Sequence, residues 1–404
     1  MRAKLRDVQV HAIEHQGQQM LLLRDPLQLG EGAIAVPRAM GLLLGLMDGT
    51  RDEAALEAAL QVRAGVRLAP GLLDQLLTDL DRAYLLDNEH YAQAKAAAAD
   101  AYRQAPFRPA TMDGAAFSPR PELAATQLQA YMDQLPPAEA EPQAAPIRGL
   151  VSPHIDYQRG GAVYAGVWRA AAQAAREAEL AIVLGTDHQG SPGTITATRQ
   201  SYATPWGVLP TDQAVVDALV EALGDGVLFD EELHHRGEHS IELAVNWLHF
   251  VRDGEPVPLV PLLCGSFGAF VEGYADPAAH EIYNRAIEVL RQALSSRRAL
   301  VIAAADLAHV GPAFGDPHGV DYIGRAQLRK ADDSLLETVY RGDAAAFFEE
   351  IKGEGDRRNI CGLPPIYLTL RILDGSTGQG TGYDLCPADP QGTSFVTIAG
   401  VTLH

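Results

Sequence analysis

Reactive side chains follow three short apolar segments in the second half of the chain. His154 comes after LVSP, His188 comes after AIVLGTD, and Asp306 comes after LVIAAA with His309 shortly behind it. Apolar segments of this length are typical of buried strands, and open α/β sheets bind ligands beyond the carboxyl ends of their strands. Two imidazoles and one anionic ligand leave open positions on a metal for substrate and for dioxygen or water. The sequence therefore predicts a metal site at the mouth of a sheet.

The segments around these residues predict the fold class. From about residue 147, apolar strands alternate with amphipathic helices, which indicates an α/β domain with a mostly parallel sheet flanked by helices on both faces. The expected strands are 147–154, 181–188, 257–265 and 299–305, and the expected helices are 162–175, 213–223 and 281–294.

Residues 1–95 predict a small helix-rich domain. MLLLRDPLQL (20–29) indicates a strand and a turn. Apolar residues at i, i+3 and i+4 spacing predict helices within 37–49, 51–61 and 71–86. An Ala-rich helical segment and a Pro, Ala and Glu-rich linker follow over 96–146, a composition that buries little surface. For a chain of 404 residues we expect two domains, 1–95 and 147–404, joined by this connector.

The N-terminal pattern resembles a known domain type. RDPLQL (24–29), LMDGTRDEAALEAAL (46–60) and the helical segment after them are similar to the PqqD-like winged-helix domains. Those domains recognise peptides in peptide-modifying systems, so the resemblance implies a peptide-binding use here.

Composition limits the partners and the compartment. The net charge of −20 is spread along the chain, and an acidic surface repels phosphate backbones and anionic lipids, so we expect no nucleic acid and no membrane partner. No apolar stretch approaches the ~18 residues of a membrane span, and the first residues lack the apolar region of a signal peptide. Cys264, Cys361 and Cys386 are too few and too scattered for a disulfide framework. We therefore expect a cytoplasmic protein with free thiols.

Several segments resemble, in order, the Memo family, called AmmeMemoRadiSam system protein B in bacteria and archaea. They are SPHIDYQRGGAVYA, VLGTDHQG, YATPWGVLPTDQAVVDAL, EHSIELAVNWL, VPLLCG, ADLAHVG, NICGLPPI and SFVTIAGVTLH. With a weaker upstream element, the resemblance spans about residues 106–404. It implies a fold similar to that of class III extradiol dioxygenases, whose non-haem iron is held by two histidines and a carboxylate.

The resemblance implies the metal ligands His154, His188 and Cys361, with the cysteine of an Ile-Cys-Gly motif in place of the carboxylate. Iron (Fe2+) is the expected metal, and copper or zinc are alternatives because a thiolate ligand alters the metal's preferences. Cys361 also precedes GLPPIYLTLRIL, whose prolines suit the first turn of a helix, and a helix N-terminus favours thiolate. Cys264, at a strand end, and Cys386, in an expected loop, are interpreted as structural thiols.

His239, Asp306 and His309 are the candidate catalytic residues. His239 and Glu242 belong to the Glu-His-Ser-Ile-Glu motif that resembles the family's. Carboxylates such as Glu242 and Asp187 can fix the tautomer of a ligand imidazole, and His309 can deprotonate a phenolic or enolic hydroxyl. An exposed residue at a helix start is the alternative interpretation of His239.

The chain departs from the family pattern in three places. Typical members carry His-Ala-Gly-Tyr at the first histidine, whereas this chain has His-Ile-Asp-Tyr. We therefore expect the Asp156 carboxylate beside the metal as a further ligand or a substrate-facing charge, and Tyr157 as a contact to substrate or to the ligand residues. Upstream, the family's His-x-Gly-x-Trp-Tyr-Pro element is weakened to MDGAAF (112–117), and Gln189 stands where a second histidine is frequent. These departures indicate an altered pocket and a different substrate.

A rival metal motif overlaps the candidate residues. His235, Glu238 and His239 match the inverted zincin pattern H-x-x-E-H, whose residues lie on one helix with both histidines on zinc. Gly237 weakens such a helix by about 1 kcal/mol, and the polar surroundings predict a loop that enters a helix at Ser240. The sequence therefore disfavours this motif.

Three functions remain open. The first is a metal-dependent, oxygenase-like redox enzyme acting on an aromatic or enolic small molecule or on a modified peptide; the family name implies a radical SAM protein and an AMMECR-type protein as partners. The second is a binding module without turnover, in which the N-terminal domain captures a leader peptide. The third is metal-assisted hydrolysis, with zinc lowering the pKa of bound water to about 7.

Overall fold

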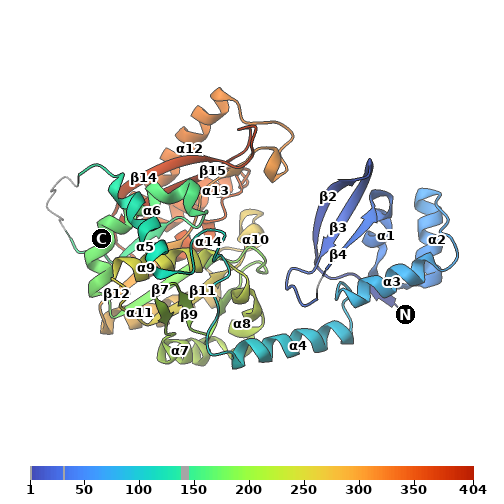
Figure 1. The fold of residues 1–404 in the computed structure, drawn as a ribbon, viewed down its shortest axis with the longest axis horizontal. Helices are drawn as coiled ribbons and strands as arrows, with labels where there is room; N and C mark the ends of the chain where they lie inside the picture. Colours follow the sequence, from blue (N-terminus) through green and yellow to red (C-terminus); the bar gives the residue numbers. More distant parts are fainter. Residues whose placement is uncertain (1, 31, 138–144) are drawn as a thin grey trace. The chain divides into compact units, whose positions relative to one another are not determined.

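The computed structural model describes residues 2–30, 32–137 and 145–404 (Figure 1). The described chain forms two compact units, Met1–Gln104 and Ala105–His404, and helix α4 (Glu89–Gln104) closes the first. Residues 138–144 of the expected Pro, Ala and Glu-rich linker lie outside the described residues. Throughout the described part of the chain, no helix is long and apolar enough to cross a membrane.

The first unit packs leucine-rich helices with small antiparallel sheets. Strands β2 (Gln9–His15), β3 (Gln18–Arg24) and β4 (Ala33–Pro37) form one sheet, and β1 (Arg2–Lys4) pairs with β5 (Asp48–Asp52). The helices are α1 (Gly41–Leu46), α2 (Glu53–Ala64) and α3 (Leu72–Arg82), with the 3-10 turn η1 (Arg38–Met40) before them. The side chain of Asp52 caps α2 by accepting from Ala55 N at 2.9 Å. The three predicted helices and the predicted strand are confirmed, while β2 and β4 were not predicted.

The second unit is built on a sheet that has eight strands within residues 145–404, with the order β13-β15-β6-β12-β7-β11-β8 and β14 paired to β15. Strands β6, β12, β7 and β11 are parallel, and antiparallel strands extend both edges. The predicted mostly parallel central sheet is confirmed. The bounds are β6 (Gly149–Ser152), β7 (Leu180–Thr186), β8 (Ile195–Ala197), β11 (Leu259–Cys264), β12 (Ala299–Ala304), β13 (His309–Val310), β14 (Gly378–Pro387) and β15 (Phe395–Leu403).

Helices cover both faces of this sheet, because successive residues of a buried strand point to opposite sides (Figure 1). Ile182 faces α7 (Gln213–Leu223), α11 (Glu281–Ser296) and α14 (Leu363–Ile372), whereas Val183 faces α6 (Tyr157–Glu177) and α9 (Ser240–Val251). The predicted α/β layers are therefore confirmed. The other elements are α5 (Pro121–Asp133), β9 (Tyr202–Thr204), β10 (Gly207–Leu209), α8 (Asp225–Phe229), η2 (Glu232–Arg236), α10 (Gly268–Val271), η3 (Pro312–Phe314), α12 (Tyr322–Tyr340) and α13 (Ala344–Gly353).

The expected loop around Cys386 is wrong. Cys386 lies in strand β14, opposite Val396 of β15. The Gly-rich and Asp-rich sequence of β14 has weak strand propensity, but pairing along the fully buried β15 outweighs that preference. Only the segment after Pro387 forms the turn between the two strands.

Candidate metal centre

The order of the central strands brings three reactive residues together. Strand β12 lies between β6 and β7, and all three run parallel. His154, Asp306 and His188 follow the carboxyl ends of β6, β12 and β7 within two residues. Because the carboxyl ends of parallel strands meet at one edge, Asp306 leaves that edge between the two histidines.

Cys361 reaches the same edge from the loop that precedes α14, as predicted for a cysteine at a helix N-terminus. Thr186 Oγ1 donates to the Cys361 carbonyl oxygen at 2.9 Å, and Gly362 N donates to the Asp306 carbonyl oxygen at 3.0 Å. A Cβ at Gly362 would lie 2.2 Å from that oxygen, so only glycine permits this close approach. The loop is thereby attached to the ends of β7 and β12.

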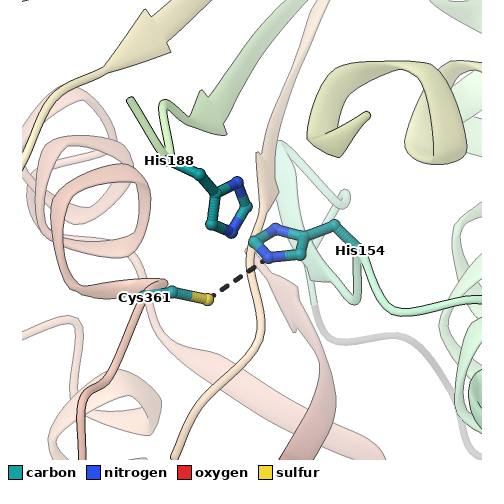
Figure 2. Close-up of side chains that lie close together, drawn as sticks. All are labelled: His154, His188 and Cys361. Carbon is teal, nitrogen blue, oxygen red and sulfur yellow. Dashed lines mark hydrogen bonds between the residues drawn. The ribbon is translucent and has the colours of Figure 1, made fainter. Parts of the chain in front are cut away.

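His154, His188 and Cys361 point toward a common centre (Figure 2). One ligand atom of each lies within 4.8 Å of the others. Cys361 Sγ is 3.2 Å from His154 Nε2, and the two imidazole centroids are 5.1 Å apart. Ligand atoms bound to one ion at about 2.0–2.3 Å lie roughly 3–4 Å from one another. The three side chains therefore have the spacing of a metal-ligand group.

Neighbouring groups determine which nitrogen of His154 faces the centre. His154 Nδ1 lies 2.9 Å from the carbonyl oxygen of Ala304, which only accepts, so Nδ1 carries a proton and Nε2 faces Cys361. Asp306 Oδ1 accepts from the backbone N of His154 at 2.8 Å. This buried histidine is thus oriented as an Nε2 ligand.

Glu238 is the buried carboxylate that orients His188. Its Oε2 lies 2.9 Å from His188 Nδ1 and accepts from the backbone N of His188 at 3.2 Å. Its Oε1 accepts from the backbone N of His239 at 2.8 Å and of Ser240 at 2.9 Å. These contacts leave His188 Nε2 free for the centre. In the sequence, Glu238 was noted only as part of the rejected zincin motif. Its place beside His239 in the Glu-His-Ser-Ile-Glu segment was a usable signal.

The charges of the centre favour a thiolate. Burial acts to raise the pKa of Cys361, but the imidazoles of His154 and His309 outweigh it and lower this pKa to about 5. Burial acts to lower the pKa of His154, but the Asp306 carboxylate and the Cys361 thiolate raise it to about 9. Burial also acts to lower the pKa of His188, and Glu238 raises it well above its usual value. Without a metal the centre holds imidazolium beside thiolate, and protons must leave the imidazoles when a metal binds.

The three candidate catalytic residues surround the ligand group. The ring of His239 stacks on that of His188 with centroids 5.1 Å apart and lies 5.6 Å from that of His154. Asp306 Oδ2 is 3.7 Å from His154 Nε2. His309 packs edge-on against Phe314 at 5.0 Å, and it is the second of the two imidazoles that lower the pKa of Cys361.

Asp156 and Tyr157 have structural roles. Asp156 caps α6, since its carboxylate accepts from Arg159 N at 3.1 Å and pairs with the Arg159 guanidinium at 2.6 Å. Tyr157 is fully buried, and its hydroxyl donates to the Leu243 carbonyl oxygen at 2.7 Å. The backbone turn after His154 therefore directs these two side chains to a helix cap and to the core.

Glu242 and Asp187 hold loops near the centre. Glu242 forms a buried ion pair with Arg108 at 2.5 Å and accepts from Thr111 N at 2.9 Å, which fixes the segment upstream of the weakened 112–117 element. Asp187 Oδ2 lies 2.8 Å from His234 Nδ1. Both carboxylates thus bind partners other than the ligand histidines.

The H-x-x-E-H residues do not form a zincin site. His235 is fully buried in the 3-10 turn η2, and His239 lies at the start of α9. The two ring nitrogens of His235 lie 2.6 Å from the Tyr202 hydroxyl and 3.0 Å from the Thr196 carbonyl oxygen. With both nitrogens engaged, His235 has no free lone pair for a metal.

A pocket of about 260 Å3 adjoins the ligand group, and we call it the metal-side pocket. His188 and Cys361 form part of its wall, so a molecule inside it would contact two of the three metal-ligand candidates. Its other lining residues are Thr186, Asp187, Cys264, Ser266, Phe267, Gly268, Asp356, Asn359, Ile360, Leu363 and Pro364. The arrangement provides a small binding site beside a ligand group that has one open side.

Comparison with known proteins agrees with this geometry. The family model of Memo-like proteins matches residues 108–384, well over half of the chain. A MEMO1 family protein of Aquifex aeolicus (strain VF5) is 28% identical over 387 residues, covering 95% of this chain and 96% of the relative, so that match extends into the first unit. A MEMO1 family protein of Methanopyrus kandleri is 28% identical over 237 residues, covering 57% of this chain and 74% of the relative. The chain belongs to the family of Memo-like proteins.

Proposed function

We propose that this chain is a metal-dependent oxidoreductase whose metal is held by His154, His188 and Cys361. The convergence of these three side chains beside the metal-side pocket is the observation that supports the proposal. Non-haem iron is the expected metal, and copper or zinc are the alternatives. The substrate class is a small aromatic or enolic molecule.

The donor set suits these metals. Imidazole and thiolate ligands favour iron, copper and zinc over magnesium and calcium, which prefer oxygen ligands. Each histidine offers Nε2 because Nδ1 is engaged by Ala304 or Glu238. Cys361 is a thiolate above a pH of about 5, so it is ready to bind at neutral pH.

The chain's own residues supply binding and proton transfer. A redox-active ion at this place would supply electron transfer and an open position for substrate. His239 keeps its Nδ1 at 3.1 Å from Glu238 Oε1, which leaves Nε2 to accept a proton from a hydroxyl. The apolar wall of Phe267, Ile360 and Leu363 excludes water around a bound ring.

Anaerobic purification tests the proposal. We expect about one iron per chain by elemental analysis, and iron-dependent oxygen uptake that catechols accelerate. Cys361→Ser should lose most of the iron. Cys386→Ser is the matched control, because Cys386 lies on β14 and its thiol contacts the Arg159 carbonyl oxygen instead.

Two results would contradict the proposal. Iron binding without any substrate that accelerates oxygen uptake would leave a metal-holding module. Zinc-dependent turnover that persists without oxygen would instead identify a hydrolase.

A further inference from the structure

The metal-side pocket has an uneven charge. Its lining contains two carboxylates, Asp187 and Asp356, and no lysine or arginine. Asp187 is already engaged, because Oδ2 contacts His234 and Oδ1 accepts from Gln189 N at 3.0 Å. Asp356 is the carboxylate whose partners decide what the pocket can bind.

Asp356 has one oxygen engaged and one available. Oδ1 accepts from Ile360 N at 2.9 Å, and no donor among the described residues reaches Oδ2. Both neighbouring arginines are committed elsewhere: Arg358 pairs with Asp332 and Glu354, and Arg357 pairs with Glu354. A half-buried carboxylate without a counter-ion is costly, so the loop holds a charge that a ligand can pair.

Asp356 and Cys361 together indicate which chemical groups a ligand of the pocket must carry. The hydrogen bond of Asp356 to the backbone N of Ile360, the residue before Cys361, holds it on the same loop as Cys361, and both residues line the pocket. Phe267 and Leu363 supply the apolar wall of the same space. A ligand that spans the pocket therefore meets the metal ligands, an apolar wall and an anionic group.

We infer that the metal-side pocket selects a small aromatic or enolic amine, whose oxygen faces His188 and Cys361 and whose ammonium group pairs with Asp356. This inference rests on the proposed function, because the oxygen is the group offered to the metal. It goes further by assigning a charge to the substrate and a specificity role to Asp356. Anionic substrates are disfavoured by the same carboxylate.

A matched set of catechols tests the charge preference. Dopamine, 4-ethylcatechol and 3,4-dihydroxyphenylacetate share the ring and differ in whether the side chain is cationic, neutral or anionic. Binding to the iron-loaded protein is measured anaerobically by calorimetry at pH 8, where Asp356, with a pKa of about 6, is ionised. We expect dopamine to bind about tenfold more tightly than 4-ethylcatechol, and the anion to bind most weakly.

Asp356→Asn isolates the charge. Asp356 has a φ of 49°, a left-handed conformation that asparagine also tolerates, and the amide oxygen can still accept from Ile360 N. In this variant, dopamine and 4-ethylcatechol should bind with about equal affinity. Asp374→Asn is the control for the overall charge of −20, because its side chain is 80% exposed and pairs with Arg291 outside the pocket; it should keep the preference.

Equal binding of dopamine and 4-ethylcatechol to the wild-type protein would overturn the inference, as would a preference that persists in a folded Asp356→Asn protein. The readout is binding and not turnover. A protein that prefers dopamine but shows no oxygen uptake would therefore contradict the proposed function and leave the pocket assignment standing.

Discussion

Glu238→Gln is the substitution that most directly tests how the centre is oriented. Five nitrogen atoms converge on the Glu238 carboxylate. Nδ1 and the backbone N of His188 approach Oε2, and the backbone N of His239 and Ser240 together with His239 Nδ1 approach Oε1. The imidazole of His188 holds the pKa of Glu238 well below its usual value against the opposing effect of burial. The carboxylate is therefore ionised, and it accepts at both oxygens.

Glutamine has the same shape but only one acceptor atom. Its NH2 group must face either the His188 nitrogens or those of His239 and Ser240, so that set loses its acceptor inside a buried site, at a cost of about 1–3 kcal/mol. If His188 loses its acceptor, its tautomer and orientation are no longer fixed. Substitution of such a partner typically weakens metal binding by about 10- to 100-fold. We expect a loss in that range for Glu238→Gln.

Competition with a chelator under anaerobic conditions measures this affinity, and thermal unfolding of the metal-free protein verifies the fold. Asp156→Asn is the control, because Asp156 is only two residues from the ligand candidate His154 but caps α6. A folded Glu238→Gln protein with wild-type iron affinity would refute the assignment of Glu238 as the positioning carboxylate. A loss of affinity in Asp156→Asn as large as that in Glu238→Gln would show that Asp156 belongs to the site.

Three further outcomes follow from the charges and ion pairs. At pH 7, metal binding should release about two protons, from His154 and His188 rather than from Cys361. The reason is that the pKa values of the two imidazoles are raised and the pKa of the thiol is lowered. Calorimetry in buffers of different ionisation enthalpy measures the number of protons released. In the metal-free protein the thiolate of Cys361 should persist as the pH falls from 9 and should be protonated only near pH 5. Absorbance at 240 nm or the rate of alkylation follows this titration. A midpoint near pH 9 would contradict the imidazolium–thiolate pair. Arg358→Met should lower the free energy of unfolding in urea by about 3–5 kcal/mol, since it leaves the fully buried Asp332 without its 2.5 Å partner. A decrease of under about 1 kcal/mol would show that this ion pair does not hold the loop.

Several features could be predicted from local sequence alone. The period of apolar residues predicted the four parallel strands of the central sheet and the helices α6, α7 and α11. The residues directly after three of those strands are His154, His188 and Asp306. Cys361 was placed at a helix N-terminus by the prolines that follow it, which the structure confirms. These predictions depend only on residues that are adjacent in the sequence and on the rule that the carboxyl ends of parallel strands lie at one edge of a sheet.

Other features depend on contacts between distant segments. The direction of a side chain is set by the turn it occupies and by the partner it meets, so Asp156 joins Arg159 as a cap and Glu242 joins Arg108, although both stand close in sequence to candidate site residues. Glu238 became the orienting carboxylate because the start of α9 packs against the loop after β7.

The α/β class, the two strand-end histidines and the helix-start cysteine follow from the sequence alone, because each is encoded within a few neighbouring residues. Only the packed chain places β12 between β6 and β7, and this strand order brings these side chains to one centre. Within the described residues, packing also leaves Asp356 at the adjoining pocket without a counter-ion, because its neighbouring arginines pair with Asp332 and Glu354. Strand order and charge pairing are properties of the packed chain, and no local pattern specifies them.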